Sequence, residues 1–128
     1  MSYHFSKTIN STIDKAKERV IEMLKEEGFG IVTEIDMQAT LKKKIDADIH
    51  PYLILGACNP KFAYEALKAE THIGTMLPCN VILQENKAGQ TEISAVDPVA
   101  SMQAIKNDKL GNVAKEVQSK LKRVIEKV

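Results

Sequence analysis

The two cysteines are the residues of this chain with the greatest chemical potential, and each is followed directly by an asparagine. Cys58 lies in the stretch LGACNP, and Cys79 lies in the stretch MLPCNV. A cysteine thiolate is a nucleophile and a metal ligand, and an asparagine amide can orient a polar group. The two stretches therefore predict one candidate site, formed by Cys58, Asn59, Pro78, Cys79 and Asn80.

Cys58 is placed where a thiolate would be stabilised. Asn59 and Pro60 are typical of a helix start, because asparagine is a frequent N-cap and proline is favoured at the first helical position. The exposed N–H groups and the dipole of such a helix lower the pKa of a neighbouring thiol. We therefore expect Asn59 to cap a helix and Cys58 to stand just before it.

Several interpretations of the Cys-Asn pairs remain open at this point. Free cysteine is among the most buried residue types, so both thiols could serve packing alone, and both asparagines could serve as backbone caps. A dithiol redox site requires that Cys58 and Cys79 meet. Cys58 ends one predicted strand and Cys79 begins another, so antiparallel neighbours would bring the two together.

No metal or cofactor is predicted from the sequence. The cysteines, with His50 or His72 as added ligands, lack the closely paired spacing of structural zinc sites. The sequence shows neither a glycine-rich phosphate loop nor a nucleophile elbow. Whether the protein is an enzyme, and which cofactor it would use, are therefore left open.

Length and composition indicate one globular domain over residues 1–128. Hydrophobic residues make up 44% and charged residues 27% of the chain, and the formal net charge is +1. This balance offers no basic field for nucleic acid. The longest apolar runs are shorter than the roughly 20 residues of a membrane-spanning helix, and the first residues lack an apolar signal core. We expect a cytoplasmic protein with neither a nucleic-acid nor a membrane partner.

Hydrophobic periodicity predicts an α+β fold. Alternation of apolar and polar residues indicates strands, whereas apolar residues at helical spacing indicate helices. The expected strands are 3–9, 29–35, 51–58, 79–86 and 90–98, and the expected helices are 11–27, 37–45, 60–70 and 107–128. The last two strands form a hairpin, and residues 72–78 are expected to be a loop. This order favours a mostly antiparallel sheet with the helices on one face.

Three motifs together resemble a known family. The stretches LGACNP, IGTMLPCNV and VDP, the last of which precedes an apolar terminal helix, are similar to the domain-of-unknown-function 302 family over nearly the whole chain. The resemblance implies a curved, mostly antiparallel five-stranded sheet with helices packed on one face. It also implies a homodimer from a bacterial or archaeal source, and it implies no established activity.

Three classes of function are compatible with these residues. The first is a domain that binds a small molecule near the two Cys-Asn motifs. The second is a thiol-dependent redox protein that uses Cys58 and Cys79. The third is a structural or interaction homodimer without a small ligand. The pKa values of the two thiols discriminate the second class from the others, because only a thiolate attacks a disulfide.

Overall fold

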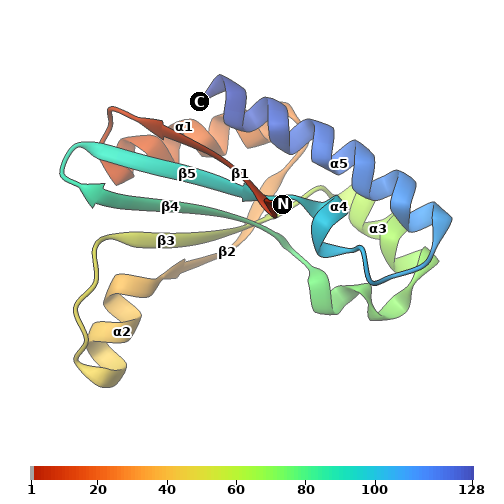
Figure 1. Ribbon diagram of the computed structural model, residues 1–128, viewed down its shortest axis with the longest axis horizontal. Coiled ribbons are helices and arrows are strands. Elements are labelled where there is room, and N and C mark those ends of the chain that lie inside the picture. Colours follow the sequence, from red (N-terminus) through yellow and green to blue (C-terminus); the bar gives the residue numbers. More distant parts are fainter. Residues whose placement is uncertain (1) are drawn as a thin grey trace.

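Five antiparallel strands form one sheet in the computed structural model, which describes residues 2–128 (Figure 1). The strand order is β1-β5-β4-β3-β2, and every neighbouring pair is antiparallel. The predicted α+β class is confirmed. The strands are β1 His4–Ile9, β2 Gly30–Asp36, β3 Tyr52–Cys58, β4 Cys79–Lys87 and β5 Gln90–Val96.

Two long helices lie side by side over one face of the sheet (Figure 1). The long helices are α1 (Ile13–Glu26) and α5 (Asp108–Lys127). The shorter helices α3 Pro60–Ala69 and α4 Pro98–Ser101, with the 3-10 helix η1 at Thr71–Met76, gather at one end, and α2 Met37–Ile45 lies at the other end beside β2 and β3. The predicted helices are thus confirmed, whereas η1 occupies most of the predicted loop at 72–78 and α4 was not predicted.

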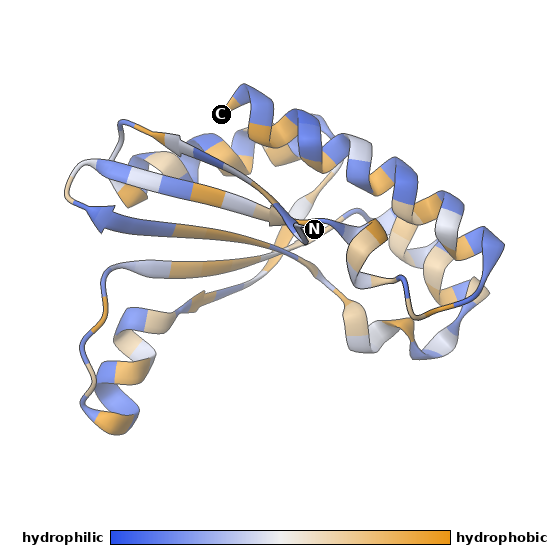
Figure 2. Cartoon of the chain, in the orientation of Figure 1, coloured by the Kyte–Doolittle hydropathy of each residue, from blue (hydrophilic) through white to orange (hydrophobic). Residues whose placement is uncertain are grey.

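The core lies between the sheet and the two long helices. Leu55, Val81 and Ile93 occupy alternate positions of their strands and are fully buried against these helices. Figure 2 shows the hydrophobic residues of α5 on the side that faces the sheet, with hydrophilic residues outside. Burial of each large apolar side chain stabilises the fold by about 1.5–3 kcal/mol, so this layer supplies most of the stability of the sheet.

Side chains at the helix starts define where two of the helices begin. Asp36 Oδ1 accepts a hydrogen bond of 2.9 Å from the Ala39 N–H and so caps α2. Asn107 Oδ1 accepts hydrogen bonds from the first turn of α5, at 3.1 and 3.3 Å. Each cap contributes about 1 kcal/mol. The observed starts of α2 and α5 agree with the predicted helices 37–45 and 107–128.

Strand β3 is covered by helices on one face only, whereas its continuous apolar run predicts cover on both. Leu53, Leu55 and Ala57 are buried beneath the long helices. Tyr52 and Ile54 point to the other face and are only partly buried. The apolar run therefore marks an interior strand whose second face packs against side chains of the neighbouring strands. We call this face of the sheet, opposite the one that the two long helices cover, the open face.

Gly56 of β3 permits two neighbours to lie against the strand on the open face. A Cβ atom at this position would overlap Thr33 Oγ1 and would lie 2.7 Å from Pro78 Cγ. Thr33 is the cross-strand partner of Gly56 on β2. The missing side chain therefore lets β2 and the residue before β4 approach β3 closely, next to the two cysteines.

We predict that Gly56→Ala lowers the free energy of unfolding by about 1–3 kcal/mol, because an extra methyl group at a crowded position must displace its neighbours. The control is Gly111→Ala in α5, where no atom lies within 4 Å of the added carbon. This control should raise the free energy of unfolding by about 0.5–1 kcal/mol through helix propensity. Chemical denaturation measures both, and a Gly56→Ala protein as stable as the parent would contradict the close approach.

Candidate functional site

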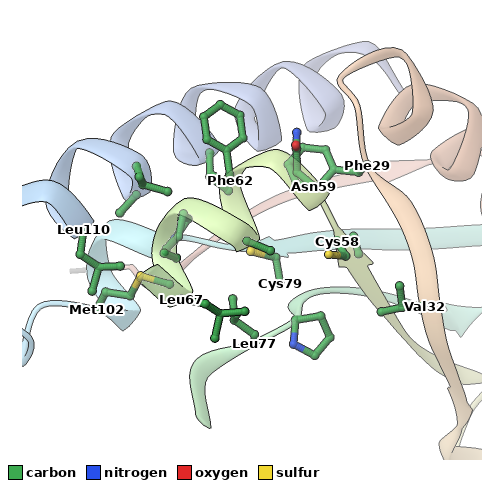
Figure 3. Close-up of a pocket in the computed structure, with 18 residues that line it drawn as sticks. Phe29, Val32, Cys58, Asn59, Phe62, Leu67, Leu77, Cys79, Met102 and Leu110 are labelled. Atoms are coloured by element: carbon green, nitrogen blue, oxygen red, sulfur yellow. The ribbon is translucent and has the colours of Figure 1, made fainter. Parts of the chain in front are cut away.

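The two cysteines lie at the place where β3 ends and β4 begins. The strands are antiparallel neighbours, and Ala57 pairs with Cys79 in their register. Cys58 follows Ala57 directly, so the strand pairing brings both thiols to the same end of the sheet. Cys58, Asn59, Pro78 and Cys79 all line one cavity of about 330 Å³ (Figure 3).

The wall of this cavity is apolar and comes from several elements. Figure 3 shows the two sulfur atoms in the middle of the lining, with Leu67 and Met102 to one side of them and Val32 to the other. Helices α3 and α5 supply much of the wall, and their contributions include Phe62, Ala63, Ala66, Leu67, Leu110, Val113 and Val117. Among residues 2–128, none of those lining the cavity carries a charge. The cavity therefore suits an apolar ligand.

Exposed apolar side chains mark the rim of the cavity, and buried ones mark its floor. Val32 is 59% exposed and Leu67 is 42% exposed. Ala57 and Ala66 are buried. Exposed apolar side chains around a hollow are typical of a ligand-binding site, because a solvated Val or Leu gains free energy when a ligand covers it.

Cys79 is a protonated thiol at neutral pH. The residue is 9% exposed, and its burial raises the pKa of the thiol from 9.0 to about 11. The charge of the neighbouring Cys58 makes a smaller contribution to this rise. Cys79 therefore behaves as a small apolar wall residue, whereas Cys58 is only partly buried.

Asn59 occupies the N-cap position of α3, but its side chain does not cap the helix as the sequence predicts. Its Nδ2 donates a hydrogen bond of 3.2 Å to the carbonyl oxygen of Glu27, just beyond the end of α1. The amide lies against Gly28, where an added Cβ would be 3.1 Å from Nδ2. The side chain thus joins the start of α3 to the end of α1, a contact between segments that the local sequence does not show.

Asn80 lies on the opposite side of the sheet from Cys79. Cys79 is buried toward the helices, whereas Asn80 is exposed and lines a second hollow on the open face. Successive side chains within a strand point to opposite faces, and this alternation separates Asn80 from Cys79 on β4. The structure therefore brings four of the five predicted residues together and separates Asn80, a separation that the alternation of the predicted strand 79–86 already implied.

The residues that the sequence analysis missed come from the helical end of the molecule. Met102 follows α4, and Leu77 follows η1, two short helices that were not predicted. Leu110 and Val113 were recognised only as part of an apolar stripe on α5. Apolar periodicity identifies such residues as core, but it does not distinguish a filled core from a lined cavity.

Two further features bear on the chemistry of the described chain. Within residues 2–128, no three His, Cys, Asp or Glu side chains are grouped so that they could hold a metal ion. No helix in the same range has the length and apolar character needed to cross a membrane.

We predict that Cys79 resists alkylation in the folded protein. At about pH 8 a thiol whose pKa is raised by two units has about a hundredfold less thiolate than an ordinary one. Iodoacetamide should therefore modify Cys79 at least about a hundredfold more slowly in the folded Cys58→Ser protein than in the same protein unfolded. Mass spectrometry of the labelled peptide measures the rates, and equal rates would restore the dithiol interpretation.

The chain matches known sequences and structures along nearly its whole length. Residues 5–128 match the family described as "Domain of unknown function DUF302". The crystal structure of an uncharacterized conserved protein DUF302 from Bacillus stearothermophilus has a TM-score of 0.90 and 25% sequence identity, covering 98% of this chain and 98% of that chain. No curated protein matches the chain. The resemblance noted in the sequence is thus confirmed, and the protein belongs to the DUF302 family.

Proposed function

We propose that this domain binds a small apolar molecule in the cavity beside Cys58 and Cys79. The observation that carries the proposal is a hollow of about 330 Å³ whose wall is apolar. Small-molecule sites are typically concave, largely apolar and about 300–1,000 Å³ in volume. Each methylene group that a ligand buries there contributes about 0.8 kcal/mol, so a compact hydrocarbon body suffices for binding.

One end of the cavity offers polar groups that would orient the ligand. The Asn59 amide nitrogen is engaged with Glu27, which leaves the amide oxygen to accept a hydrogen bond. The partly buried Cys58 thiol lies beside it in the same wall. A ligand with an apolar body and one hydrogen-bonding group near Asn59 therefore fits the cavity best.

The redox alternative has less support. Thiol-disulfide exchange begins with a thiolate, and burial raises the pKa of Cys79 to about 11. Both cysteines are free, so an exchange reaction would have to begin from one of these two thiols. A protonated thiol in an apolar wall serves ligand binding better than electron transfer.

We predict that Ala63→Leu, which adds bulk to the cavity wall, weakens binding of prodan, a neutral naphthalene dye with one carbonyl group. The dye should bind the parent protein saturably, with a fluorescence blue shift. The larger side chain should fill the space of two or three methylene groups and should weaken binding by about tenfold or more. Fluorescence titration measures both dissociation constants.

The matched control for this experiment is Ala69→Leu. Ala69 lies on the same helix and is also half-buried, but it does not line the cavity. The control protein should bind prodan as the parent does. Equal weakening in both variants, or no saturable binding by the parent, would refute the proposed ligand site.

A homodimer is a second proposal, and the observation that favours it is helix α2. This helix has 9 residues, and none of them is buried. Isolated helices shorter than about 12–15 residues are marginal in water, so α2 needs a partner. Ile45 on α2 is 70% exposed, and Val32 and Ile35 on the edge strand β2 are exposed as well. We call these three residues the β2–α2 surface.

A second copy of the chain would cover the β2–α2 surface by twofold symmetry, in which the same patch serves both partners. Exposed edge strands are also frequent sites of association. Val32 belongs to the rim of the apolar cavity too. The second copy would therefore lie next to the opening of the cavity and would help to shield a bound ligand from water.

We predict that Ile45→Asp converts a dimer into a monomer, because a carboxylate at the centre of an apolar contact must be desolvated. The control is Tyr64→Asp, which places the same charge at another exposed hydrophobic residue, on α3 and outside the β2–α2 surface. Light scattering at micromolar concentration measures the mass of each protein. A parent protein that is monomeric there would rule out this interface.

A further inference from the structure

The open face of the sheet carries a second hollow, which the apolar cavity does not use. Its volume is about 410 Å³, and it is lined by residues of β1, β3, β4 and β5. Asn80, the residue separated from the cysteines, belongs to this hollow. Glu92, Gln84 and Ser94 line it as well. This wall is therefore much more polar than that of the first cavity.

Glu92 is held in a fixed position by a chain of hydrogen bonds. Gln84 is its cross-strand partner, and Gln84 Nε2 donates a hydrogen bond of 3.2 Å to Glu92 Oε1. His50 Nε2 lies 3.0 Å from Gln84 Oε1 and donates to it, because that oxygen can only accept. These bonds orient the Glu92 carboxylate, and they occupy one of its two oxygens.

A second chain of hydrogen bonds forms the floor of the hollow. Ser6 Oγ and Ser94 Oγ are 2.7 Å apart, and His4 Nδ1 lies 2.7 Å from Ser6 Oγ. Ser94 is 5% exposed, so this floor is a preformed polar surface inside the sheet. Polar groups that are already ordered cost little conformational entropy when a ligand binds.

The charge of the hollow favours a cation. Across residues 2–128, no lysine or arginine lines it, and Glu92 is the one carboxylate that does. The ring of Tyr52, whose residue pairs with Gln84, offers a further attractive surface for a cation. Ile82 lies between the polar positions of β4 and can contact an aliphatic chain.

We propose that the open face binds a small organic cation of the primary alkylammonium class. The ammonium group donates a hydrogen bond to the unoccupied oxygen of Glu92, and the alkyl chain lies over Ile82 toward Asn80. This site is separate from the apolar cavity, because Glu92 and Asn80 point away from the helices that enclose that cavity. The two proposals can therefore succeed or fail independently.

The test is a titration of the protein with n-butylammonium at low ionic strength, followed by nitrogen-proton correlation NMR. The backbone amides of Glu92, Ser94 and Asn80 should shift saturably. Glu92→Gln keeps the shape and removes the charge, so it should weaken binding by about tenfold or more, as expected for a lost charge-assisted hydrogen bond. Glu116→Gln removes the same charge from an exposed position on α5 and should leave binding unchanged.

Two neutral or anionic probes of the same chain length complete the test. n-Butanol and butyrate should shift the same amides far more weakly than n-butylammonium does. Equal affinity for n-butanol would overturn the proposal, because it would show a contact that does not depend on charge. Unchanged n-butylammonium affinity in the Glu92→Gln protein would overturn it too. The n-butanol comparison uses the parent protein, so it tests whether binding depends on charge even if the Glu92→Gln variant fails to fold.

Discussion

The antiparallel pairing of β3 with β4 is the contact on which the rest of this structure depends. The chain leaves β3 after Cys58, forms α3 and η1, and returns to the same place at Cys79. The helical excursion is therefore held beside the end of the sheet, where α5 packs against it. The apolar cavity lies between these parts, and Gly56 allows β2 and Pro78 to close in around the same point.

The pleat of the sheet divides the chemistry of the molecule between two faces. On β4, Cys79, Val81 and Leu83 are buried toward the helices, whereas the alternate residues face the open side. The helix side is apolar and holds a hollow suited to a hydrocarbon body. The open side has a carboxylate, amides and hydroxyls joined by hydrogen bonds. A single strand thus lines two hollows of opposite character because its side chains alternate.

Burial and reactivity compete at the two cysteines. A helix N-terminus stabilises a thiolate, whereas an apolar surrounding destabilises it. Cys79 lies deep in the apolar wall, and its raised pKa shows that burial dominates at that residue. The Asn59 amide does not cap the helix beside Cys58. It donates a hydrogen bond to Glu27 and so stabilises the junction of α1 and α3. Cys58, Asn59 and Cys79 therefore line the cavity, and the second Cys-Asn pair is split between two faces.

Local patterns in the sequence determined the class of fold and most of its elements. Alternation predicts β1 to β5, and apolar residues at helical spacing predict α1, α2, α3 and α5, because these signals arise from contacts within a few residues. Four of the five predicted site residues do meet, since strand ends that pair also bring their flanking residues together. Tertiary structure alone decided the rest. The contact of Asn59 with Glu27, the cavity between α3 and α5, and the unburied helix α2 all depend on distances between segments remote in sequence, and periodicity carries no information about those distances.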